Sequence, residues 1–197
     1  MKRTWLLTLA LIAMLASSAV AAPGAIWVGV NGGIGLPFGE FRDAASAGFN
    51  LGLTGDYMMS DTWAFGGELG WHKFGGNDDF EKSESVRRGV PVEITTRAIP
   101  ITAYAKYLLP ANESAAPFLK AAFGLYNINT KIDAGSEGDS NDSATKFGFQ
   151  FGGGMNFKNT ESVAYGAELL YHYIATENKA SNMITLRGQL LFGFPGR

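Results

Sequence analysis

The chain has 197 residues with 26 glycines, and aromatic residues make up 13% of it, so one domain accounts for the length. Charged residues make up only 17% and the formal net charge is −2, which excludes a disordered chain and a basic nucleic-acid-binding protein. No cysteine is present, so disulfides, zinc–thiolate sites and cysteine nucleophiles are excluded as well.

The first 21 residues predict a cleaved signal peptide. Lys2 and Arg3 provide a positive start, an apolar run covers 5–15, and the small residues 19–21 fit a cleavage site. An uncleaved membrane anchor is the alternative, but the apolar run is short for a spanning helix of about 20 residues. We therefore expect an exported mature chain of residues 22–197. The strand pattern must then show where this chain resides.

Eight segments of the mature chain alternate apolar and polar residues with the period of two that predicts β-strands. In chain order they cover 26–34, 49–58, 63–74, 98–109, 119–126, 146–157, 163–173 and 184–194. The clearest is 146–157, in which Phe147, Phe149 and Phe151 lie on one side and the other side consists of glycines and polar residues. A polar side so rich in glycine indicates a crowded interior and not open solvent.

The connections between these segments alternate in length. Short turns fall at 60–61, 110–113 and 158–161, and longer loops at 36–45, 75–91, 132–144 and 175–181. An even number of strands, with short turns at one end and long loops at the other, is the layout of outer-membrane barrels. The predicted fold is therefore all-β, a transmembrane eight-stranded antiparallel up-and-down β-barrel, whose interior is filled by side chains.

The inward-facing positions carry both signs of charge, and buried charges need partners. We expect them to pair in a polar network of the lumen, formed by Asp56, Glu68, Lys106, Lys120, Lys146, Glu168 and Arg187. Glu68 and Glu168 are also a candidate carboxylate pair for acid–base chemistry. We favour the interpretation in which they neutralise Arg187 and the inward lysines, because buried charges require partners.

Several stretches resemble the small outer-membrane barrel superfamily of the OmpA transmembrane domain, OmpX and the opacity-type proteins. Residues 27–33, 99–107 and 117–124 resemble the first, fourth and fifth strands of these barrels, and the likeness extends over about 24–194. The last strand resembles their C-terminal assembly signal, with Phe192 and Phe194 as its aromatic residues. The resemblance implies a Gram-negative outer membrane, contact with its lipid, and recognition by the barrel-assembly machinery.

The function is less constrained than the fold. His72 and His172 are predicted to face the lumen, whereas the lipid A deacylase barrels that share this architecture use a His–Ser pair on the lipid side. The acidic segment 133–142 lacks the ligand order of a calcium loop, so no metal and no cofactor is expected. We expect a non-enzymatic structural or surface-interaction (adhesion-type) role through loops 76–91 and 132–144. The alternatives are a narrow or gated small-solute channel and, third, a lipid-A-modifying enzyme.

Overall fold

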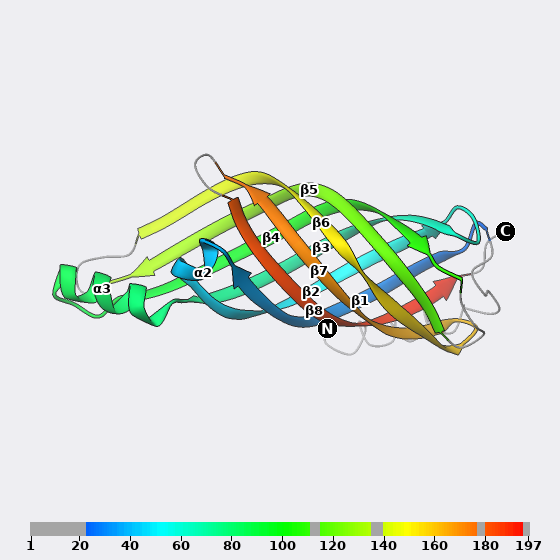
Figure 1. Ribbon diagram of the computed structural model, residues 1–197, viewed down its shortest axis with the longest axis horizontal. Helices are drawn as coiled ribbons and strands as arrows, with labels where there is room; N and C mark the ends of the chain where they lie inside the picture. Colours follow the sequence, from blue (N-terminus) through cyan, green and yellow to red (C-terminus); the bar gives the residue numbers. More distant parts are fainter. Residues whose placement is uncertain (1–22, 111–114, 135–139, 177–179, 195–197) are drawn as a thin grey trace, which may run out of the picture.

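The computed structural model describes residues 23–110, 115–134, 140–176 and 180–194, and in it eight antiparallel strands close into one barrel (Figure 1). Each strand pairs with its neighbours in the sequence, and the first pairs with the last. The strands are β1 (Ile26–Phe38), β2 (Ala45–Met58), β3 (Trp63–Gly76), β4 (Glu93–Leu108), β5 (Ala115–Asp133), β6 (Ser140–Thr160), β7 (Val163–Ala175) and β8 (Ala180–Phe194). The predicted up-and-down topology is confirmed. The predicted signal peptide lies outside the described residues.

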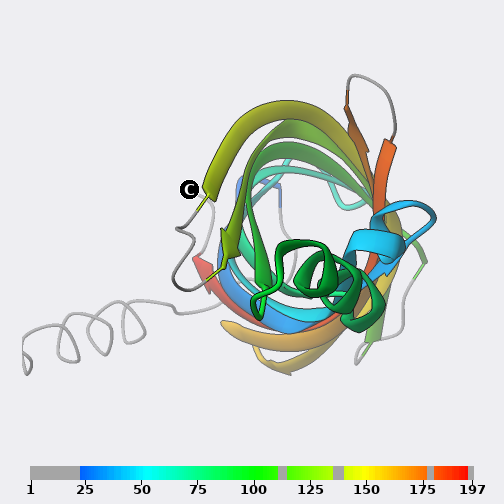
Figure 2. The same cartoon turned by 90° about the vertical axis from the view of Figure 1, so that its left-hand side faces the viewer.

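Two helices lie at the end of the barrel that carries the long connections. They are α2 (Phe41–Ala44) and α3 (Asp78–Arg88), and Figure 2 shows them over part of the barrel opening. The segment 75–91, predicted as a loop, contains a helix and carries a start signal at Asn77 and a stop signal at Gly89. Asn77 accepts a hydrogen bond from the backbone of Asp79, and Gly89 takes the left-handed conformation at φ 73°. Among the described residues, no helix combines the length and apolar character needed to cross a membrane.

The alternation of side chains divides the barrel wall into an outer and an inner face. On β6, Phe147, Phe149 and Phe151 are exposed, whereas Gln150 is buried in the lumen. Glycine makes room on the inner face, since a Cβ on Gly148 would lie 2.7 Å from the ring of Tyr126. The polar, glycine-rich side of this strand therefore faces a crowded interior, as its sequence predicted.

β4, β5 and β6 extend further toward the α3 end than predicted, and the polarity of their two faces inverts there. On β5 the outward positions change from apolar at Phe123 and Leu125 to polar at Asn127 and Asn129. The amide of Asn129 donates to the side-chain oxygen of Asn141 on β6 over 2.7 Å, so this outer face is a polar surface.

The inward positions change in the opposite sense at the same level. Ile94 on β4 is buried, and Ile128 on β5 packs against the buried Phe74 and its neighbours. Over most of its length the barrel therefore has an apolar outer face and a polar lumen. At the α3 end the outer face is polar and the interior is apolar. This end includes 93–97 of β4 and 127–131 of β5, which lie beyond the ends of the predicted strands.

Candidate functional site

A buried arginine joins two carboxylates at mid-height in the lumen. Arg187 on β8 donates two hydrogen bonds to Glu68 on β3, from Nη1 over 2.7 Å and from Nη2 over 3.0 Å. The same Nη2 donates to Oε1 of Glu168 on β7 over 2.6 Å. Lys120 on β5 completes the cluster, with its Nζ 2.6 Å from Glu68 and 3.7 Å from Glu168. Four strands thus contribute two cations and two anions to one cluster.

A second ion pair lies nearer the end with the short turns. Nζ of Lys106 donates to Oδ2 of Asp56 over 2.9 Å, and the hydroxyl of Tyr104 donates to Oδ1 over 2.7 Å. Nζ of Lys120 lies 4.3 Å from the centre of the Tyr104 ring, within the range of a cation–π contact. Tyr104 therefore connects the two groups of charges, a role that the sequence analysis did not assign to it.

The two groups contain three acidic and three basic side chains, and all six are buried. Lys146, which the sequence placed in the same network, lies elsewhere. It is half-buried near the α3 end, eight residues along β6 from Gly154, the residue that pairs with Glu168. At about 3.3 Å per residue this is roughly 26 Å along the strand. The inward direction of Lys146 is as predicted, but its height in the barrel separates it from these ion pairs.

The two histidines form a layer on the α3 side of the ion pairs. His72 and His172 are fully buried, with ring centroids 5.5 Å apart in an edge-on arrangement. Nδ1 of His172 lies 3.1 Å from the hydroxyl of Tyr126, and its Nε2 lies 3.0 Å from that of Thr185. Both rings are therefore inside the barrel, away from the outer surface on which a lipid-facing His–Ser pair would lie.

Some polar atoms in the lumen have no partner within the described structure. They include both side-chain polar atoms of Asn31 and Asn50, and both ring nitrogens of His72. Buried polar groups are normally hydrogen-bonded, and ordered water supplies the bond where protein does not. The polar lumen is therefore suited to hold water around the ion pairs, which bears on whether it conducts.

The apolar interior at the α3 end contains a cavity of about 410 Å³, which we call the cup. Residues of α2, α3 and β3 to β8 line it, and its apolar wall includes Phe41, Phe74, Phe80, Ile94, Ile128 and Ile132. Asp142 and Lys146 on β6 contribute its charged groups. The cup was not predicted, although the sequence contains a signal for it. The alternation continues through 93–98 and 127–132, where the inward residues are mostly apolar and the outward residues are polar.

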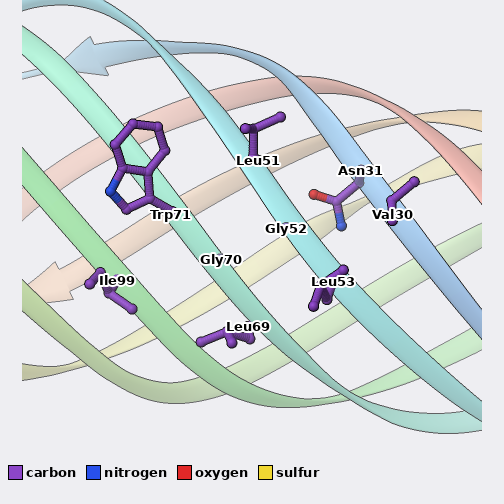
Figure 3. A pocket seen from close by; sticks show the side chains of 9 residues that line it. All are labelled: Val30, Asn31, Leu51, Gly52, Leu53, Leu69, Gly70, Trp71 and Ile99. Carbon is purple, nitrogen blue, oxygen red and sulfur yellow. The ribbon is translucent and has the colours of Figure 1, made fainter. Parts of the chain in front are cut away.

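A second hollow, of about 460 Å³, lies on the outer face of the barrel (Figure 3). Its floor is the backbone at the paired glycines Gly52 and Gly70, and its walls are apolar side chains, among them Leu51, Leu69 and Trp71. It belongs to the apolar outer band. Its lining is apolar apart from Asn31, whose side chain is buried in the barrel wall.

Helix α3 is held to the barrel by side chains that bond to backbone. Oε1 of Glu81 accepts from the backbone N–H of Ile94 over 2.7 Å, and Oγ of Ser85 accepts from that of Val92 over 2.9 Å. The amide of Asn77 donates to the carbonyl of Arg42 over 3.0 Å, which joins α3 to α2. The segment 76–91 is thus an ordered projection from the barrel wall.

The other segment expected to meet a partner, 132–144, is only partly described. β5 continues to Asp133 and β6 begins at Ser140, while 135–139 lie outside the described residues. Within the described ranges, no group of three or more potential ligands is arranged to hold a metal ion.

The chain matches a family model described as an outer membrane protein beta-barrel domain over residues 7–189. No curated protein matches it. Among solved structures, Neisserial surface protein A is 19% identical with a TM-score of 0.60, and the match covers 86% of this chain and 98% of that one.

Two further structures have the same fold. Ail, the attachment invasion locus protein of Yersinia pestis, is 14% identical with a TM-score of 0.53, covering 86% of this chain and 99% of Ail. OprG of Pseudomonas aeruginosa is 13% identical with a TM-score of 0.52, covering 89% and 98%. At these identities, the structural matches support the barrel fold and leave the role to be argued from the chain itself.

Proposed function

This chain belongs to the outer membrane protein beta-barrel domain family, and from that premise we propose that it is a non-enzymatic barrel with a surface-interaction (adhesion-type) role at its extracellular end. Its location is the bacterial outer membrane. In such barrels the short turns are periplasmic and the longer loops extracellular, so the α3 end is the outer one. The apolar outer band then faces lipid.

The observation that carries the proposal is the ordered projection at the extracellular end. β4, β5 and β6 continue beyond the lipid-facing band, and Glu81 and Ser85 fasten α3 to them. Exposed segments on a rigid scaffold are where binding residues commonly lie. Support also comes from the relatives: Ail is described as an attachment invasion protein, and one of its structures contains the heparin analogue sucrose octasulfate.

Adherence of cells that display the chain tests this role. A laboratory Gram-negative strain expressing it should adhere to immobilised matrix proteins or sulfated glycans more than cells with an empty vector. Replacing 78–88 by a glycine–serine linker should abolish the gain, while changing the periplasmic turn at 60–61 should preserve it. Equal adherence of all strains, at equal surface levels of folded barrel, would overturn the proposal.

A narrow or gated channel is the second candidate, favoured by the unpartnered polar atoms of Asn31, Asn50 and His72 in the lumen. We propose that the ion pairs of Glu68 and Arg187 close the lumen instead, because the side chains occupy its middle with balanced charge. Purified protein in planar lipid bilayers should then show no steady, discrete openings. Regular openings at neutral pH would favour the channel.

A lipid-A-modifying enzyme is the third candidate. The absence of enzymatic function is part of our proposal, supported by the position of His72 and His172 inside the lumen. Lipid A mass profiles from cells with and without the chain should be identical. A mass change that depends on either histidine would restore the enzymatic interpretation.

Export and assembly complete the proposal. We propose that residues 1–21 are removed, and that Phe192 and Phe194 on β8 form the signal read by the barrel-assembly machinery. N-terminal sequencing of the folded protein should then begin at Ala22. Phe194→Ala should lower the amount of folded barrel in the outer membrane without lowering the stability of barrels refolded from urea.

A further inference from the structure

We propose that the cup is a binding site for a small organic anion with a hydrocarbon body, such as a medium-chain fatty acid. Helix α3 contributes Phe80 to the cup and also belongs to the proposed adhesion surface, but the inference stands whether or not the adhesion-type role is correct.

The first reason is that the cup is an apolar concavity on the water side of the barrel. Part of its wall belongs to strand segments whose outer faces are polar, such as Asn127 and Asn129 on β5, so the cup extends beyond the lipid-facing band. Inside it are Phe80 of α3, Ile94 of β4 and Ile128 of β5. Ligand-binding sites are typically large apolar pockets that face water and contain a few polar groups.

The second reason is that the floor of the cup is closed, so the cup is a dead-end cavity and not the mouth of a pore. Phe74, Tyr126, Ile174 and Met183 pack together there, each almost completely buried. Phe41 of α2 covers this floor, with its ring centroid 5.3 Å from that of Phe74 in an edge-on contact. A ligand that enters from outside is therefore stopped at this layer.

The third reason is the size and charge of the cavity. At about 30 Å³ for each water-sized group, 410 Å³ takes roughly a dozen non-hydrogen atoms. Lys146, a half-buried residue, lines the wall, and Asp142 lies four residues nearer the open end, roughly 13 Å along the strand. Among the charged side chains lining the cup, the deeper is therefore a cation. An acyl carboxylate matches it, with the hydrocarbon against the phenylalanine and isoleucine side chains.

The test uses methyl NMR of the full barrel in lipid nanodiscs, because detergent would compete for the cup. Octanoate is the probe, and octanol is its uncharged counterpart. The isoleucine methyls divide naturally into two sets: the cup holds Ile94, Ile128, Ile132 and Ile174, and the lipid-facing surface holds Ile26, Ile34, Ile99 and Ile101. Octanoate should shift the first set saturably, at concentrations on the order of 1 mM, and leave the second set in place.

Two variants with matched controls complete the test. Ala144→Trp fills the cup and should abolish the shifts, whereas Ala103→Trp on the lipid face should not. Lys146→Gln should weaken octanoate about tenfold and leave octanol unchanged, whereas Lys82→Gln on exposed α3 should change neither. Each variant is first checked for a folded barrel by its gel mobility before heating.

Two results would overturn the proposal. If octanoate moves the lipid-facing methyls and not those of the cup, the probe has only partitioned into the bilayer. If octanol binds as tightly as octanoate, and Lys146→Gln changes nothing, the site does not select an anion. Loss of cell adherence with intact octanoate binding, or the reverse, separates this site from the proposed surface role.

Discussion

Arg187 on β8 and Glu68 on β3 meet across the lumen through two parallel hydrogen bonds of 2.7 and 3.0 Å. In the sheet these strands are separated by β1 and β2, so the contact crosses the interior and joins separate parts of the wall. Both side chains are buried, and Arg187 also holds Glu168. The arginine is therefore the central contact of the polar lumen.

Arg187→Met should destabilise the barrel severely. The change leaves Glu68 and Glu168 with only Lys120 to offset their charge, and removing one partner of a buried ion pair typically costs about 3–5 kcal/mol. Urea unfolding of the protein refolded into lipid vesicles, followed by circular dichroism, measures the loss. Arg97→Met is the control, since Arg97 is exposed on the outer face of β4, and it should cost less than about 0.5 kcal/mol.

Removing both members of the pair should cost less than the two single changes together. In Glu68→Gln with Arg187→Gln, Lys120 and Glu168 remain 3.7 Å apart as one balanced pair. The single variants each leave an unbalanced buried charge. A double-mutant cycle in the same unfolding assay measures the coupling, and free energies that add within about 0.5 kcal/mol would show that the two residues act independently.

Phe149→Arg should block insertion, and the adjacent Gln150→Ala should be tolerated. Phe149 faces lipid, where an arginine costs about 2–4 kcal/mol. Gln150 is inside and donates to the hydroxyl of Tyr126 over 2.9 Å, so its truncation should cost about 1 kcal/mol. Gel mobility of unheated samples distinguishes folded from unfolded barrel. The reverse order of the two effects would place each residue on the opposite face.

The strands that cross the bilayer could be predicted from the sequence alone, because lipid requires a strict alternation of apolar outward and polar inward residues in them. In 146–157 every outward position is apolar or glycine, so one pattern gives both the strand and its orientation. The inward direction of Glu68 and Arg187 follows from the same register. Which charges meet does not, because partners such as Glu68 and Lys120 belong to strands that do not pair with each other.

The extracellular end was harder to predict for a physical reason. Once the strands leave the lipid, the outward face becomes polar and the inward face apolar, as at Asn127 and Ile128. Polar residues outside and apolar residues inside are the pattern of a water-soluble sheet, whereas a membrane strand has the opposite pattern. Helix α3 was missed because its stabilisation comes from caps and from bonds such as Glu81 to Ile94, and not from an apolar stripe.

Gly148→Ala should destabilise the barrel, whereas Gly55→Ala should not. A Cβ on Gly148 would lie 2.7 Å from the Tyr126 ring and 2.8 Å from the carbonyl oxygen of Tyr173, and overpacking of this kind costs about 1–3 kcal/mol. A Cβ on Gly55 would meet nothing within 4 Å. Urea unfolding in vesicles compares the two. Equal stabilities would mean that the lumen near Tyr126 has room that the packing does not show.

Glu81→Ala should loosen the extracellular projection without weakening the barrel. The change removes the acceptor of the Ile94 amide and leaves the neighbouring bond between Ser85 and Val92 in place. Amide hydrogen exchange should therefore accelerate over about 76–94, most strongly at Ile94, while the lumen-facing strands keep their protection. Lys82→Ala, on the exposed side of α3, is the control and should leave the exchange pattern unchanged. If Glu81→Ala also leaves it unchanged, α3 is held by its contacts with α2 through Asn77 instead.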